Sequence, residues 1–150
     1  MVVAIIGSND YNRSSSMAIR MWSIIGRLVV KDGDNIFLFS NANSFDKDCW
    51  EIVSQLKMHF NVERHYIHGG CDYDVGYVDN LSEFYDELYF PEKGIVFPCY
   101  LRDRAMIDKC DVLVTYCDNE QLQTERKNSV ALAVAYAMQK KKRVINLFEG

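Results

Sequence analysis

The chain has little proline and no paired-cysteine motif. Its two prolines, Pro91 and Pro98, are expected to bracket an extended linker. The five cysteines are odd in number and form no CxxC pair, which argues against a disulfide framework and favours free thiols in a reducing cytoplasm. A zinc site made of His65, His68 and Cys71 fits no standard ligand spacing, and we expect no metal.

The chain also lacks long apolar runs and an excess of positive charge. It has no stretch of about 18–20 apolar residues, so we expect no membrane-spanning helix. Residues 1–7 lack the charged region of a signal peptide, so we expect a cytoplasmic protein. The net charge of −4 and the pI near 5.3 argue against nucleic-acid binding, which needs a basic face. The basic run at 140–143 is interpreted as the end of a helix, where cations complement the helix dipole.

What remains is the composition of an ordinary globular domain. The 150 residues are 49% hydrophobic and 25% charged, which is enough apolar material for a core without cross-links. The sequence shows no repeat and no low-complexity segment. We therefore expect one domain over residues 1–150.

Short apolar runs alternate with helically spaced apolar residues along most of the chain. The irregular stretch 68–98 is an exception, in which residues 81–88 have the spacing of a short amphipathic helix. Strands are expected at 2–6, 36–39, 62–67, 111–116 and 143–147, with a helix at 101–109, a loop at 117–127 and a helix at 128–140. This order predicts a three-layer α/β/α Rossmann-like sandwich with a mainly parallel sheet of about five strands.

Two of the expected helices begin with clear capping residues. Ser14, Ser15 or Ser16 can cap the helix after the first strand. Ser44 or Asp46 can cap the helix after the second strand. Such caps accept hydrogen bonds from the free N–H groups of the first turn.

Polar residues gather where the expected strands end, which is the ligand-binding edge of open α/β sheets. The candidate site consists of Gly7, Ser8, Asn9, Asn43, Ser44, Arg102, Tyr116, Asn128 and Ser129. Each loop taken alone contains only the turn and cap residues that any such fold needs. Together they indicate a nucleotide-sized site, because several helix N-termini there favour an anion such as phosphate.

Two arginines begin the helix before the fourth strand. Arg102 and Arg104 cannot share one helical face, so at most one of them points into the site. We expect Arg102 to contact a phosphate, since a guanidinium suits bidentate anion contacts. Arg104 is expected on the surface, in a salt bridge with Asp103 or Asp108.

The chain resembles the SLOG superfamily of Rossmann-like domains, which joins the Lonely Guy and DNA-processing protein A families with many small uncharacterised bacterial proteins. Lonely Guy phosphoribohydrolases carry an Arg, a Met four residues later and an Asp five residues after the Met. Here Arg102, Met106 and Asp111 hold those positions. Residues 89–93 and 128–148 look like the small-protein branch. The likeness to DNA-processing protein A is at fold level only, and the acidic balance does not support single-strand binding.

The departures from the Lonely Guy pattern bear on activity. Residues 117–119 replace the Pro-Gly-Gly of that family, and residues 128–130 replace its small loop. Ala133 stands where the resemblance implies a catalytic Glu, and an alanine has no acid–base group. Phosphoribohydrolase activity is therefore not expected.

Three functions remain open. The first is non-catalytic binding or sensing of a nucleotide or nucleotide-derived molecule, with Tyr116 or Tyr100 near the base or ribose and no other cofactor. The second is an N-glycosidase or nucleoside deoxyribosyltransferase-like enzyme, whose carboxylate would be Asp108, Asp118, Glu120 or Glu125. A carboxylate within hydrogen-bond reach of Arg102 would favour that enzyme. The third is a structural or partner-binding module with a vestigial pocket, whose tyrosine-rich segment 66–90 is an interface. We expect a homodimer.

Overall fold

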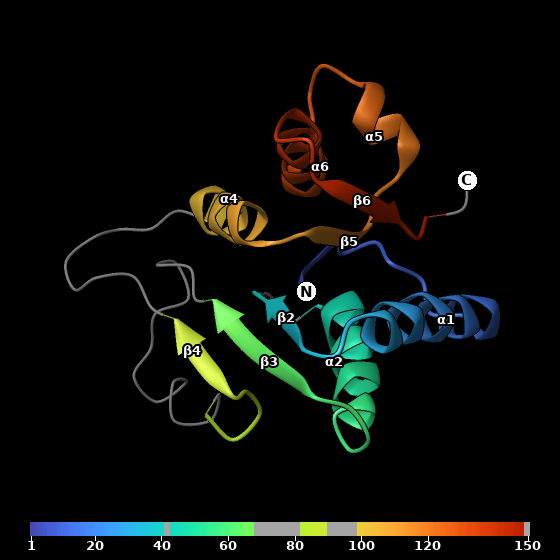
Figure 1. Cartoon of the computed structure of the whole chain (residues 1–150). Helices are drawn as coiled ribbons and strands as arrows, with labels where there is room; N and C mark the ends of the chain where they lie inside the picture. The colour runs from blue at the N-terminus through green and yellow to red at the C-terminus, as the bar shows by residue number, and fades with distance from the viewer. Residues whose placement is uncertain (41–42, 68–81, 90–98, 149–150) are drawn as a thin grey trace.

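The computed structural model is a parallel sheet with helices on both faces (Figure 1). It describes residues 1–40, 43–67, 82–89 and 99–148. The strands are β1 (Val2–Gly7), β2 (Asn35–Phe39), β3 (Val62–Ile67), β4 (Glu87–Tyr89), β5 (Val112–Tyr116) and β6 (Arg143–Asn146). The helices are α1 (Ser15–Lys31), α2 (Ser44–Leu56), α4 (Cys99–Lys109), α5 (Asn119–Gln123) and α6 (Ser129–Gln139). The α/β sandwich with a parallel sheet is confirmed, with six strands instead of about five.

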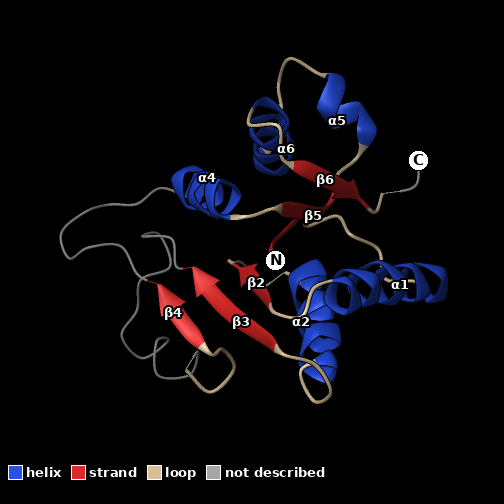
Figure 2. Ribbon diagram, in the orientation of Figure 1, coloured by secondary structure: helices blue, strands red, loops and turns tan. Residues whose placement is uncertain are grey.

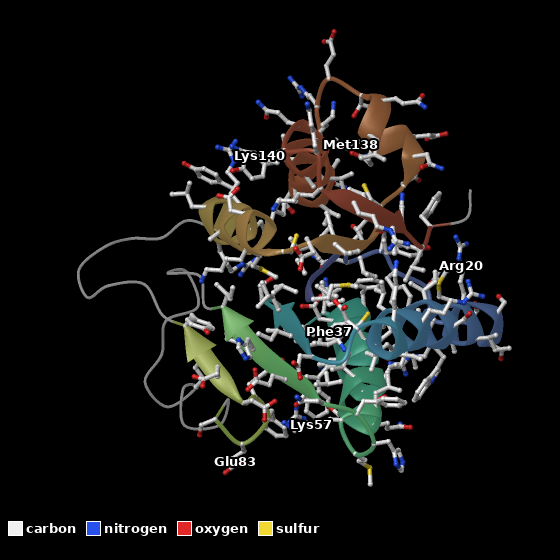
Figure 3. The ribbon with its side chains drawn as sticks, viewed as in Figure 1. Arg20, Phe37, Lys57, Glu83, Met138 and Lys140 are labelled. Carbon is white, nitrogen blue, oxygen red and sulfur yellow. The ribbon has the colours of Figure 1, made fainter. Side chains whose placement is uncertain are left out.

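The strand order is β4-β3-β2-β1-β5-β6, and every neighbouring pair is parallel. Helices α1 and α2 cover one face of the sheet, and α4 and α6 cover the other (Figure 2). Alternate residues of each central strand therefore face different helices. Phe37, labelled in Figure 3, is fully buried in the α1/α2 cluster, whereas its neighbour Leu38 belongs to the α4/α6 cluster.

The caps follow the sequence prediction at α1 and differ from it at α2. The Ser14 hydroxyl accepts a hydrogen bond from the N–H of Met17 at 3.1 Å. At α2 the cap is Asn43, whose Oδ1 accepts from the N–H of Asp46 at 2.9 Å, so the expectation of Ser44 or Asp46 was wrong. Asn43 is held in place because its Nδ2 donates to the carbonyl of Gly7 at 2.9 Å.

The helix expected at 81–88 was also wrong. Residues 87–89 form strand β4, which extends the sheet beyond β3, and Leu81 lies outside the described residues. The helical spacing of the apolar residues has another cause. The Tyr85 ring packs against Tyr66 and Phe39, with ring centroids 5.1 and 5.9 Å apart, and the Trp50 indole donates to the carbonyl of Phe84 at 3.0 Å.

Two smaller differences concern the last third of the chain. The loop expected at 117–127 contains the short helix α5, which is capped by Asp118. The basic run at 140–143 follows α6, but its Lys142 caps a different helix. The Lys142 ammonium donates to the carbonyl of Cys110 at 2.9 Å, at the carboxyl end of α4, where a cation complements the dipole.

Among the described helices, none combines the length and the apolar character that crossing a membrane would require.

Candidate functional site

A small pocket of about 60 Å³ lies where β1 and β2 end. It is formed by the last residues of β1, the residue after β2, the first turn of α2, the start of α4 and the start of α6. Its lining consists of Ile6, Gly7, Ser40, Asp46, Arg102, Asp103, Ser129 and Val130. This is the carboxyl edge of the sheet, where the sequence predicted a site.

Three charged side chains line this pocket, and all are buried. Arg102, Asp103 and Asp46 are only 6%, 7% and 2% exposed. The Arg102 Nε and Nη2 lie 3.3 and 3.4 Å from Oδ1 of Asp103, so the two neighbours on α4 form an ion pair. Burial raises the pKa of the Asp103 carboxyl, although the Arg102 guanidinium acts in the opposite direction. The pocket thus combines one guanidinium with two carboxylates.

Gly7 is required at the pocket floor by packing. A Cβ atom at this position would lie 2.1 Å from Cδ1 of Phe45, which is a fully buried residue in the first turn of α2. The missing side chain lets α2 begin directly against the end of β1. Gly7 therefore brings the start of α2, with Asp46, to the pocket.

The structure brings three of the predicted site residues together, namely Gly7, Arg102 and Ser129. Arg102 points inward, whereas Arg104 is exposed on the opposite face of α4. Ser8 is buried beside the pocket floor, and its N–H donates to the carbonyl of Tyr116 at 3.0 Å. These placements follow from the helical period of α4 and from the parallel pairing of β1 with β5.

Other predicted site residues have local structural contacts. Asn43 caps α2, and Asn128 caps α6 by accepting from the N–H of Ala131 at 2.8 Å. Asn9 accepts a hydrogen bond from Asn43 Nδ2 at 3.3 Å. Ser44 is exposed in the first turn of α2. These residues therefore shape the edge around the pocket without lining it.

Tyr116 lies on the α1/α2 face of the sheet, away from α4 and α6. It is 9% exposed and belongs to an aromatic cluster, with ring centroids 5.2 Å from Tyr11 and 5.3 Å from Phe148. Tyr100 is exposed, and its ring lies 5.7 Å from the guanidinium of Arg104. The structure thus gives Tyr116 a core contact and Tyr100 a surface contact, and neither lines the pocket.

Arg104 is on the surface, as expected, but its contacts are aromatic. Its guanidinium lies 5.0 Å from the centroid of the Tyr136 ring. The two expected partners are engaged elsewhere: Asp103 pairs with Arg102, and Asp108 accepts a hydrogen bond from the Tyr136 hydroxyl at 2.7 Å.

The four acids considered for an enzyme do not line the pocket. Asp108, Glu120 and Glu125 are exposed, and Asp118 caps α5 through a 2.8 Å bond to the N–H of Glu120. The carboxylates that do line it, Asp46 and Asp103, were missed as site residues.

The spacing of apolar residues in α4 could have identified Asp103 as a buried residue. Arg102 and Asp103 lie one helical turn before Met106 and Ile107, which are both fully buried. Residues four apart share a helical face, so the apolar pair already places Arg102 and Asp103 on the buried side of α4. Asp46 carried no such signal, because it stands in a capping region.

A larger hollow of about 210 Å³ lies between α1 and α2. Its polar groups bond to one another: the Tyr11 hydroxyl donates to Asp48 at 2.9 Å, and Arg13 Nε donates to the same oxygen at 2.9 Å. This hollow contains none of the residues that the sequence nominated for a site.

The residues considered for a zinc site and the cysteines lie away from the pocket where the structure describes them. His65 is buried, with Nδ1 3.4 Å from the Tyr89 hydroxyl, while His68 and Cys71 lie outside the described residues. Cys49, Cys110 and Cys117 are free and buried, and burial raises the pKa of the Cys110 thiol to about 11. Such a thiol is a poor nucleophile at neutral pH.

The chain matches no protein-family model and no curated protein. The resemblance to the SLOG superfamily therefore depends on the sequence motif. In the structure, Arg102 lines the pocket, Met106 is buried in the core, and Asp111 accepts a hydrogen bond from the N–H of Val2 at 2.8 Å.

Proposed function

We propose that this protein binds a nucleotide or nucleotide-derived small molecule at the carboxyl edge of its sheet, as a non-catalytic SLOG-like domain. One observation carries the proposal: Gly7, Arg102 and Ser129, from three distant segments, line a single pocket at that edge. Open α/β sheets bind ligands at this edge. Buried charges are costly for stability, which favours a role in binding for Arg102 and its carboxylate neighbours.

The residue in place of the expected catalytic Glu supports the non-catalytic part of the proposal. Ala133 is 4% exposed and packs in the core cluster beneath α4 and α6. Its methyl group is neither an acid nor a base, so the N-glycosidic chemistry of the Lonely Guy family has no acid–base group at this position.

The pocket is too small for a whole nucleotide. Its volume of about 60 Å³ is far below the roughly 300–1,000 Å³ of pockets that enclose whole ligands. One group of the ligand would enter it, while the rest of the ligand would lie across the outer edge, near the exposed Ser129.

Titration calorimetry tests the proposal with AMP, ADP, ATP, NAD and ADP-ribose. We expect at least one of them to bind the wild-type protein at submillimolar concentration and to lose most of its affinity in Arg102→Ala. Arg104→Ala is the matched control, because it removes an exposed arginine two positions away and should leave the affinity unchanged. Circular dichroism checks whether both variants fold. Absence of binding by every ligand at millimolar concentration contradicts the proposal.

An N-glycosidase is the second candidate, and one observation favours it. The carboxylate of Asp103 lies within hydrogen-bond reach of Arg102 in the pocket, which is the arrangement that such an enzyme would need. Chromatography of nucleosides and nucleotides after incubation with the protein distinguishes the two functions. Release of free base that is abolished by Asp103→Asn establishes the enzyme, and its absence favours the binding protein.

We further infer a cytoplasmic protein that forms a homodimer and does not bind nucleic acid. The buried free thiols suit a reducing compartment, and the net charge is −4. Within the described part of the tyrosine-rich segment 66–90, Tyr66 is 2% exposed, whereas Tyr89 is 40% exposed. Light scattering measures the mass against 17.4 kDa for one chain.

A further inference from the structure

We infer that the pocket receives the paired hydroxyls of the ligand's sugar, and that any phosphate of the ligand stays outside it. This inference rests on the proposed function and specifies which part of the ligand is recognised there. It replaces the expectation from the sequence that Arg102 contacts a phosphate.

The charge of the pocket opposes an anion. Among the described residues, its lining contains one positive and two negative side chains, each more than nine-tenths buried. The positive one, Arg102, already lies 3.3 Å from the carboxylate of Asp103. A phosphate that entered would meet two carboxylates in a poorly solvated space, where repulsion is screened less than in water.

The hydrogen-bonding groups of the lining match a diol. Ionised carboxylates only accept hydrogen bonds, a guanidinium only donates them, and a hydroxyl does both. A sugar hydroxyl can therefore donate to Asp46 or Asp103 while it accepts from Arg102. Ser40, which is 2% exposed, and Ser129 add two protein hydroxyls to the same lining. Hydrogen bonds to charged groups of this kind are stronger than those between neutral groups.

The size of the pocket agrees with this assignment. A volume of about 60 Å³ is far below the roughly 300–1,000 Å³ of pockets that enclose whole ligands, so only a small group of the ligand, such as a pair of neighbouring hydroxyls, enters it. The described part of the lining has no aromatic ring on which a base could stack. Its apolar side chains are those of Ile6 and Val130.

The test compares four compounds by titration calorimetry: adenosine, AMP, 2′-deoxyadenosine and 2′,3′-dideoxyadenosine. Removing a hydroxyl loses a hydrogen bond to a charged group in the pocket, so each deoxy compound should bind the wild-type protein roughly tenfold or more weakly than adenosine. AMP should bind within about threefold of adenosine, because its phosphate gains no contact in the pocket.

Two variants test whether Asp103 causes the preference for adenosine over its deoxy forms. Asp103→Asn should reduce the preference for adenosine over its deoxy forms. Asp108→Asn, an exposed carboxylate on the same helix, should leave that preference unchanged. A purely structural Asp103 would alter the stability without altering this ratio. If Asp103→Asn fails to fold, the comparison of ligands on the wild-type protein still tests whether the pocket binds the sugar hydroxyls.

The outcomes separate the two proposals. If adenosine and its deoxy forms bind equally, or if AMP binds more than about tenfold tighter than adenosine, the sugar assignment is overturned while the nucleotide function stands. If none of these compounds and no nucleotide binds, both proposals are overturned. A sugar preference that Asp103→Asn leaves intact, in a folded variant, also overturns the assignment of Asp103.

Discussion

Gly7 and Gly26 differ in the space that the structure leaves for a side chain. A Cβ atom at Gly7 would lie within 2.1–2.7 Å of three atoms of the Phe45 ring, and Phe45 is fully buried. A Cβ atom at Gly26, in the middle of α1, would meet no described atom within 4 Å apart from its chain neighbours and the backbone of its own helix. The first glycine is therefore required by packing, and the second has no such requirement in the described structure.

We predict opposite effects of alanine at these positions. Gly7→Ala should lower the free energy of unfolding by about 1–3 kcal/mol, because the core must shift to admit a methyl group. Gly26→Ala should raise it by about 0.5–1 kcal/mol, because alanine restricts the unfolded chain and favours the helix. Urea denaturation measures both. A Gly7→Ala protein as stable as the wild type would contradict the packing at the pocket floor.

Asp86 makes stability depend on pH. Burial alone would raise the pKa of this carboxyl, but hydrogen bonds from Lys57 and Arg64 outweigh burial and lower the pKa. A carboxyl with a lowered pKa in the folded state stabilises the protein above its unfolded value near 3.8, and this contribution is lost as the pH falls through the folded value.

The wild-type protein should therefore exceed Asp86→Asn in stability at about pH 6, and this difference should shrink at about pH 3. Urea denaturation at both pH values measures it. Glu83→Gln is the control, since Glu83 is an exposed carboxylate three residues away, labelled with Lys57 in Figure 3. A difference between wild type and Asp86→Asn that stays constant across this range would refute the assignment.

At the scale of elements, the start of α2 depends on one side chain. Asn43 accepts from the N–H of Asp46 and donates to the carbonyl of Gly7, so it ties the helix to the end of β1. Ser44, the cap expected from sequence, is exposed. Substitutions of Asn43 and Ser44 can therefore be compared, because Asn43 caps α2 and Ser44 does not.

Asn43→Ala should reduce the free energy of unfolding by about 0.5–2 kcal/mol, the usual cost of losing a cap. Ser44→Ala should change it by less than about 0.5 kcal/mol, as for most surface substitutions. Thermal or urea denaturation of the two variants measures the difference. Equal losses would mean that Ser44 shares the capping role.

At the scale of the whole molecule, the sheet joins two helical layers into one structure. Leu113 is fully buried in the α4/α6 cluster, whereas its strand neighbours Val112 and Val114 belong to the α1/α2 cluster. Both tryptophans lie on the α1/α2 side, where Trp22 borders the hollow between these helices and Trp50 packs on the core. A substitution that destabilises one helical layer should therefore also destabilise the other, because both layers pack on the same strands.

We predict that Leu113→Ala lowers the free energy of unfolding by about 2–5 kcal/mol. The transition followed by tryptophan fluorescence should shift as far as that followed by far-ultraviolet circular dichroism, because the layers unfold together. Phe37→Ala, on the other face, is the matched comparison and should shift both signals equally. If Leu113→Ala has the same fluorescence unfolding transition as the wild type, the two layers unfold separately.

The sequence by itself determined the features that depend on local periodicity. Short apolar runs identified the five longer strands, and the helical period of α4 showed that Arg102 and Arg104 cannot both point into the site. Because parallel strands all end at one edge, the position of the candidate site followed from the fold class. These inferences need only the local spacing of apolar and polar residues along the chain.

The tertiary structure decided what depends on contacts between distant residues. Residues 87–89 are a strand because β3 offers an open edge, and Asn43 is the cap because Gly7 holds its amide. Tyr116 faces the core because β5 pairs with β1 in one register. Asp46 and Asp103 meet Arg102 only when α2 and α4 pack on the end of the sheet, so the charge of the pocket is a property of the folded molecule.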